Sequence, residues 1–323
     1  MILPYSLKLL CLCLASFFLL HAALGSVVWL AAPAAINLAE TMRARVAARF
    51  ILFVRALPMM LAGAVVLGVA VPSYIWLEPH TSGESVGPAC FVAALLGLAT
   101  WCISIARVVC LTVRSRQYMR QCERIGGEIS ITAAALPTRL LDLDTPLIAL
   151  AGVFRPKVLV SRSVIDALSA EQLDAALRHE HAHRVSRDNL KRLLLRLAPD
   201  IFPFVLNLSN MERAWARFSE WAADDEATGG DVRLSLSLAE ALLRVARLGN
   251  AVPASVLLTP LLAGDLASRV NRLLQKNAVM PAPVGRSGAL SGVITVAAVF
   301  AFTVMQWPIV LRVTHEILER LVG

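Results

Sequence analysis

The chain has 323 residues, of which 57% are hydrophobic and only 17% charged, and its mean hydropathy is +0.67. A soluble domain is about 45–50% apolar and about 25% charged, so this composition excludes a wholly soluble protein and requires lipid as well as a protein core. The formal net charge of +8 does not indicate nucleic-acid binding, because the chain has no recognised DNA- or RNA-binding motif, and Lys and Arg collect on the cytoplasmic flanks of membrane spans.

Four apolar stretches are each long enough to cross the hydrocarbon core of a bilayer, which takes about 20 helical residues. They lie at about residues 9–31, 57–77, 89–113 and 288–311. The first stretch could instead be a signal peptide, but its apolar run exceeds the roughly 7–15 residues of a signal core, which favours a retained span. We therefore predict a membrane region of three spans in residues 1–113, and a fourth span with a short outer tail in residues 284–323.

The distribution of Lys and Arg predicts the orientation of these spans. Arginines follow the first and third spans, whereas the connection at residues 78–88 contains neither Lys nor Arg. By the positive-inside rule, both termini lie outside and the long connection before the fourth span lies inside. Residues 114–283 are therefore expected to form a cytoplasmic domain.

A few ionisable residues lie within the predicted spans, where they are costly in lipid. His21 lies inside the first span, while Arg55 and Arg107 are close enough to the cytoplasmic side to extend into the headgroup region. No chain of carboxylates crosses the membrane, which argues against an ion carrier or transporter.

The predicted cytoplasmic domain begins with a mixture of strands and helices. Short strands are expected at 147–151 and 157–161, with Gly152 and Pro156 marking the turn between them. Ser169 then caps a helix that continues past His183. Further helices are predicted at residues 192–196, 212–228, 234–248 and 267–275.

The helix that begins after Ser169 contains an HExxH motif, formed by His179, Glu180 and His183. Residues four apart lie on one helix face, so the two imidazoles can bind one metal ion. Glu180 can then contact a metal-bound water, whose pKa zinc lowers towards about 7. The motif predicts metal-assisted attack on a peptide carbonyl with Glu180 as general base. The alternative is a basic helix face. His181 points to a different side of the helix and is left out of the ligand set.

A metal site of this kind needs a third protein ligand, and the helix at 212–228 offers Glu220. Asp224 lies four residues further along the same face, where it can orient a ligand histidine from outside the coordination shell. A solvated acidic face is the alternative, because the two residues after Asp224 are also acidic. Glu212 is a rival third ligand, but no acid four residues further on supports it.

Three other charged residues near these motifs are expected to have structural roles. Asp188 is interpreted as a helix cap or salt-bridge partner. Arg213 and Arg217 precede Glu220 on the same helix, where pairing on the helix surface is favoured over stabilisation of an oxyanion.

Together these residues resemble the membrane zinc metallopeptidases of the BlaR/MecR type, the beta-lactam sensor-transducers, and more distantly the HtpX-type membrane proteases. The quoted likeness covers Thr145-Pro146, Gly152–Val160, the HExxH helix with Arg187-Asp188, Glu220–Asp224 and Ser268–Leu274. The resemblance implies a mainly α fold, with four transmembrane helices and a gluzincin-like α+β metallopeptidase domain that contains a small sheet. It also implies a multi-pass protein of the bacterial inner membrane.

The resemblance further implies the roles of individual residues. One Zn²⁺ per chain would be bound by His179, His183 and Glu220, with Glu180 as general base and acid and Asp224 outside the coordination shell. The strand formed by Lys157, Val158, Leu159 and Val160 would bind substrate in extended form, as an added β-strand.

One departure from the sensor-transducers limits the inference. They end in a large extracellular penicillin-binding domain, whereas only a short tail follows the fourth predicted span here, so antibiotic sensing is not expected. We expect a membrane endopeptidase that cleaves a protein or peptide, such as a cytoplasmic repressor, in regulatory proteolysis or signalling. The alternative is a signalling or scaffold protein that retains zinc without turnover. The presence of Glu180 argues against it, because metal binding does not require the base.

Overall fold

The computed structural model describes residues 4–77, 86–125, 127–129, 138–142, 146–200, 208–249, 258–261 and 265–275, together with residues 313 and 316. This part of the chain is mainly helical and contains a small sheet, as the sequence predicts. The predicted fourth span at 288–311 lies outside the described residues.

Three helical segments are long and apolar enough to cross a membrane. The first is α1 (Tyr5–Glu40). The second is α2 (Ala44–Val65), which continues through the π-helical segment η1 (Val66–Ala70) into α3 (Val71–Leu77), and the third is α4 (Pro88–Ile125). Only 22–33% of the residues in their most apolar windows are buried, so most of these side chains face outward, as they would towards lipid. The chain is therefore a membrane-embedded protein with at least these three segments.

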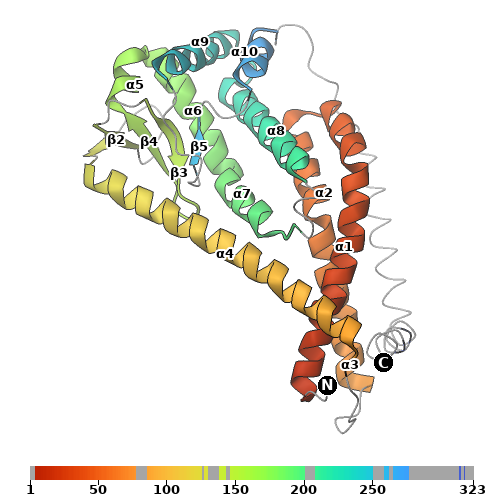
Figure 1. Ribbon diagram of the computed structural model, residues 1–323. Helices are drawn as coiled ribbons and strands as arrows, with labels where there is room; N and C mark the ends of the chain where they lie inside the picture. The colour runs from red at the N-terminus through yellow and green to blue at the C-terminus, as the bar shows by residue number, and fades with distance from the viewer. Residues whose placement is uncertain are drawn as a thin grey trace.

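The ends of these helices extend beyond the membrane-length bundle and pack against the α/β part of the chain that follows α4. This part is called the soluble domain below. Figure 1 shows α1 and α2 side by side, with α4 running obliquely from the foot of the bundle to the sheet. Near the domain, Ala39 of α1 and Ile51 of α2 pack in one apolar cluster with Trp215 and Phe218 of α8 (Ser209–Thr228). Because this cluster includes Ala39, α1 continues beyond the C-terminal end of the predicted span at residue 31.

Close packing between α1 and α4 depends on a glycine. A Cβ atom added to Gly97 of α4 would lie 2.5 Å from the backbone oxygen of Leu14 in α1. Small residues allow helix backbones to approach closely in membranes. Gly97 therefore marks a tight crossing of two spans.

Buried polar contacts join the bundle to the soluble domain. His21 Nε2 lies 3.0 Å from the backbone oxygen of Pro199, and Arg55 Nη2 donates to Asp200 Oδ1 at 2.7 Å. The side chain of Arg55 is only 1% exposed. The expectation that Arg55 extends to the headgroup region is therefore wrong, because the soluble domain covers it and supplies its carboxylate partner.

The sheet has the strand order β1-β2-β4-β3-β5. Its strands are β1 (Gly127–Ile129), β2 (Thr138–Leu141), β3 (Ile148–Ala151), β4 (Lys157–Ser161) and β5 (Leu258–Pro260). β2 and β4 are parallel, and the other neighbouring pairs are antiparallel. The strands predicted at 147–151 and 157–161 thus form the β3–β4 hairpin, and its turn begins at Gly152, whose φ is +95°.

The position of β4 overturns one expectation. β4 lies between β2 and β3, so both of its edges are already hydrogen-bonded. The side chains of Val158, Leu159 and Val160 have no exposed surface. The prediction that Lys157–Val160 binds substrate as an added strand is therefore wrong for this fold, because an added strand needs a free edge.

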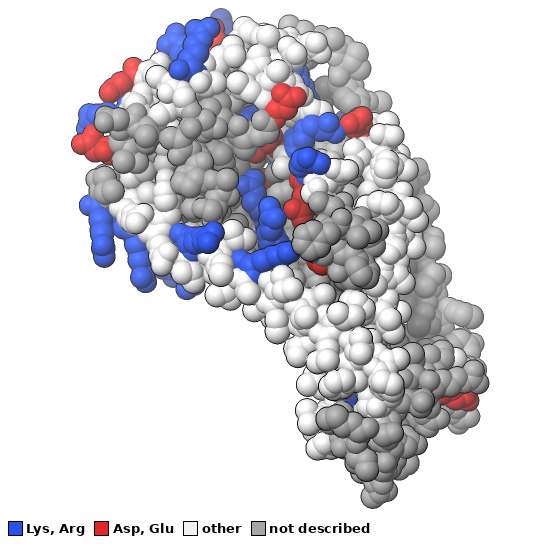
Figure 2. All heavy atoms as spheres, in the orientation of Figure 1, with Lys and Arg blue, Asp and Glu red and all other residues white. Residues whose placement is uncertain are grey.

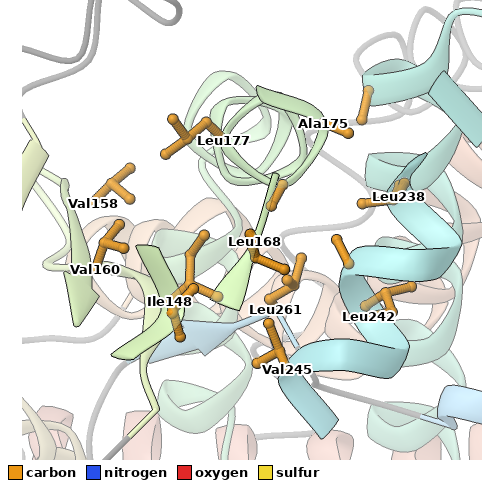
Figure 3. Close-up of a cluster of buried hydrophobic side chains, with 14 of the residues drawn as sticks. Ile148, Val158, Val160, Leu168, Ala175, Leu177, Leu238, Leu242, Val245 and Leu261 are labelled. Atoms are coloured by element: carbon orange, nitrogen blue, oxygen red, sulfur yellow. The ribbon is translucent and has the colours of Figure 1, made fainter. Parts of the chain in front are cut away.

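The remaining helices pack against the sheet and one another. They are α5 (Arg162–Ala167), α6 (Ala170–Ser186), α7 (Asp188–Leu197), α8, α9 (Val232–Leu248) and α10 (Leu266–Gln275). Figure 3 shows the main core, where aliphatic side chains of β3, β4, α6 and α9 meet. The core fixes α6, the helix that carries HExxH, directly against β3 and β4.

Candidate metal centre

The helix that carries HExxH has well-defined ends. At its start, the Gln172 backbone N–H donates to Ser169 Oγ at 3.3 Å, and the Ser169 N–H donates to Gln172 Oε1 at 3.1 Å, so the predicted cap Ser169 is part of a capping box. At its end, Arg187 has φ +55° and is the one non-glycine residue of the described chain with a positive φ. The chain therefore turns sharply after α6 and begins α7 at Asp188.

This turn is fastened to the sheet. Asn189 Nδ2 donates to the backbone oxygens of Leu150 at 3.0 Å and Gly152 at 2.9 Å. Asn189 is buried, so these bonds also satisfy its amide away from water. The junction between α6 and α7 is held in one position relative to β3.

Three predicted ligands converge in the interior. His179 Nε2 and His183 Nε2 lie 3.0 Å apart, and the carboxylate oxygens of Glu220 lie 3.4 Å and 3.6 Å from them. One ligand atom of each residue lies within 4.8 Å of the others, and all three residues are buried. Two imidazoles and one carboxylate in this arrangement could hold a metal ion.

Two carboxylates orient the imidazoles. His179 Nδ1 lies 2.9 Å from Asp224 Oδ1, and His183 Nδ1 lies 2.7 Å from Asp188 Oδ2. With each Nδ1–H donated to a carboxylate, the Nε2 lone pairs are left for a metal, as in known metal sites where a carboxylate binds the other ring nitrogen of a ligand histidine. Asp224 thus occupies the position predicted for it. Asp188 has a larger role than the expected cap or salt bridge, because it contacts a ligand.

Asp188 is itself held in place by two further donors. Ser219 Oγ donates to Asp188 Oδ2 and Lys191 Nζ to Asp188 Oδ1, both at 2.9 Å. Burial raises the pKa of Asp188, but the hydrogen bond from His183 and the charges of His183 and Lys191 outweigh burial and lower the pKa below its ordinary value. Asp188 is therefore an ionised acceptor beside His183.

Arg269 of α10 is a further residue of this site, and no sequence motif predicts it there. Its side chain is 1% exposed and donates to both carboxylate oxygens of Asp224, at 2.9 Å and 2.6 Å. Its Nη1 also lies 3.1 Å from Glu220 Oε2. The one feature of the sequence that points to Arg269 is its position in Ser268–Leu274, a segment that resembles the sensor-transducers.

Arg269 compensates the charge of the two acids of α8. Burial raises the pKa of Asp224, but Arg269 and His179 overcome it and bring the pKa to about 2. Burial likewise opposes ionisation of Glu220, whose pKa is nonetheless held well below its ordinary value by His183 and Arg269. Both carboxylates are therefore ionised in the interior, which requires this buried cation.

Glu180 is buried, and neither of its carboxylate oxygens has a side-chain hydrogen-bond partner among the described residues. Burial raises its pKa to about 7, and the neighbouring charges of His179 and His183 offset part of the effect. A buried carboxylate without a partner is costly for folding, and such perturbed groups concentrate at functional sites.

The other charged candidates lie outside this centre. His181 is exposed, and Glu212 lies 3.6 Å from Arg55 rather than near the histidines. Arg217 donates to Glu40 at 2.7 Å, and Arg213 bonds Asn210. The contacts of Arg213 and Arg217 agree with the pairing that the sequence predicts for them.

A solvated acidic face on α8 is likewise not what the structure shows at Glu220 and Asp224. The neighbouring acids do form such a face, because Asp225 pairs with Arg272 and Glu226 with Arg45 at partly exposed positions. Glu220 and Asp224 instead point into the interior, where each is 1% exposed or less.

No protein-family model matches the chain, and no curated protein matches it either. The likeness to the sensor-transducers therefore rests on the motifs quoted above. The candidate metal centre rests on its own geometry.

Proposed function

We propose that this chain is a membrane-embedded zinc endopeptidase. The observation that supports it best is the convergence of His179, His183 and Glu220 on one point, next to a buried Glu180 carboxylate with no side-chain hydrogen-bond partner among the described residues. Two imidazoles and one carboxylate are a ligand set of catalytic zinc sites, which leave a position for water or substrate.

The proposed chemistry assigns one task to each residue. Bound zinc would supply a Lewis acid that lowers the pKa of a coordinated water towards about 7 and polarises the peptide carbonyl. Glu180 accepts a proton from the attacking water at a carboxylate oxygen and passes it to the leaving amine. Asp224 and Asp188 hold the two imidazoles in the tautomer that directs Nε2 to the metal, and Arg269 keeps Glu220 ionised.

The distribution of charge supports a proposed orientation in the membrane. Figure 2 shows Lys and Arg gathered on the soluble domain, whereas the visible face of the membrane-length part is almost free of them. By the positive-inside rule we place the domain in the cytoplasm and the N-terminus outside, in a bacterial inner membrane. A cytoplasmic protein, such as a repressor, is then the proposed substrate, as the resemblance to the sensor-transducers implies.

Zinc content and cleavage, measured on the detergent-purified chain, test the proposal. We expect about one zinc per chain, lost in Glu220→Ala and retained in Glu226→Ala, a control on the exposed face of the same helix. Glu180→Gln should retain zinc and lose cleavage of a proteome-derived peptide library. A folded chain that takes up no zinc would refute the proposal. Zinc bound without any cleavage by the wild-type chain would favour the scaffold alternative.

A further inference from the structure

A pocket of about 530 Å³ opens beside the candidate metal centre. One wall is the β3–β4 turn, Gly152 to Lys157, and the opposite wall is the junction of α6 and α7 around Arg187. His183, one of the three proposed ligands, forms part of its lining, as does Asp188. The pocket therefore adjoins the candidate metal centre on the side of His183 that faces Asp188.

The pocket is strongly basic. Arg155, Arg184, Arg187 and Lys157 line it, and its one acidic lining residue, Asp188, is already bound to His183, Ser219 and Lys191. A concave surface lined by one sign of charge concentrates ligands of the opposite sign.

Three of these cations have no acidic partner among the residues that the structure describes. Lys157 lies 3.2 Å from Glu123, but Arg155, Arg184 and Arg187 form no side-chain hydrogen bond or ion pair within the described part of the chain. Other arginines pair with acids, such as Arg178 with Asp174 and Arg272 with Asp225, while exposed Arg233 and Arg247, like Arg155, Arg184 and Arg187, have no side-chain partner among the described residues. What sets Arg155, Arg184 and Arg187 apart is that all three line the same pocket.

We propose that this pocket is a specificity subsite that binds the carboxylate of an Asp or Glu side chain in the substrate. The proposal rests on the proposed peptidase function. The guanidinium group binds carboxylates through two parallel N–H donors, which the ammonium of lysine cannot do. Because the pocket adjoins the candidate metal centre through His183, the acidic residue is expected on one side of the scissile bond and close to it in the substrate sequence.

Cleavage-site profiling tests the proposal on the zinc-loaded, detergent-purified full chain. The probe is a library of chymotryptic peptides from a bacterial proteome, which keep internal Asp, Glu, Lys and Arg, and mass spectrometry records the residues on each side of every new cleavage. We expect Asp and Glu to be enriched about tenfold over Asn and Gln at one position, the factor that one charge-assisted contact supplies.

Variants connect this preference to the pocket. In Arg184→Gln/Arg187→Gln, the ratio of acidic to neutral cleavage sites should fall to near that of the library, and Arg184→Glu/Arg187→Glu should shift the preference to Lys and Arg. Arg178→Gln, on the same helix but outside the pocket, should keep the wild-type ratio. Arg155→Gln changes the exposed turn and should reduce the ratio of acidic to neutral cleavage sites by a smaller amount. This variant tests the pocket if the double variants do not fold.

The possible failures are distinguishable. Cleavage without an acidic preference, or a preference unchanged in both double variants, overturns the subsite while the peptidase stands. Loss of co-purifying anionic lipid from the double variant, with an unchanged cleavage profile, assigns the arginines to lipid headgroups instead. A folded, zinc-loaded chain that cleaves no peptide overturns the peptidase itself, and the subsite with it.

Discussion

Removal of the buried cation beside the metal centre gives the most quantitative prediction. In Arg269→Met, Glu220 and Asp224 lose the guanidinium that contacts both of them, and neither has surface exposed to water. Breaking a buried ion pair by removing one partner costs about 3–5 kcal/mol. With roughly 2–4 °C per kcal/mol for a domain of this size, we expect the metal-free variant to melt roughly 6–20 °C below the wild type.

A matched control lies one turn further along α10. Arg272 also binds a carboxylate through two N–H groups, at 2.6 Å and 2.8 Å from Asp225, but its side chain is 31% exposed. Solvated pairs contribute about 0–1 kcal/mol, so Arg272→Met should shift the melting temperature by only a few degrees.

A double-mutant cycle in detergent separates charge from packing. Asp224→Asn should be costly alone, and in Arg269→Met/Asp224→Asn it should recover part of the loss, because one uncompensated charge is gone. We expect a coupling energy of at least about 2 kcal/mol from thermal or denaturant unfolding without metal. Coupling near zero, or an equal cost for Arg269→Met and Arg272→Met, would show that Arg269 does not compensate the acids.

Further predictions concern the metal and the spans. Asp188→Asn should weaken zinc affinity about 10–100-fold, measured by competition with a chelator, because it loses the acceptor that orients His183. Burial lowers the pKa of His183, but Glu220 and Asp188 raise it to about 10, so the metal-free imidazole is protonated at neutral pH and zinc must displace that proton. Calorimetry in buffers of different ionisation enthalpy should show release of about one proton per zinc at pH 7, and apparent affinity should rise with pH until about pH 10; no proton release would contradict the assignment. Gly97→Leu should lower thermal stability in detergent, whereas Gly25→Leu, with open space around it, should not.

Local rules were sufficient to predict much of the site. The four-residue spacing of His179 and His183, and of Glu220 and Asp224, fixes each pair on one helix face whatever the tertiary structure. The capping box at Ser169 likewise depends only on residues three apart.

Other features depend on tertiary structure and leave little local signal. Asp188 reaches His183 because Arg187 adopts a left-handed conformation, which its residue type does not indicate. Arg269 lies 45 residues from Asp224 on another helix, and no periodicity relates the two. β4 is enclosed because it also pairs in parallel with β2. The continuous apolar run of β4 is compatible with such a buried strand but does not by itself predict this long-range pairing.

The place of Arg269 in the chain has a consequence for biosynthesis. Among the residues of the metal centre it is the last to be synthesised, after the three apolar helical segments, both histidines and both acids of α8. Domains form from the N-terminus as the ribosome proceeds, and until α10 docks, the acids of α8 have no cation to compensate their burial. A nascent chain therefore cannot complete its candidate metal centre before these segments have left the ribosome, and under the proposed function peptide cleavage is delayed until most of the molecule has been made.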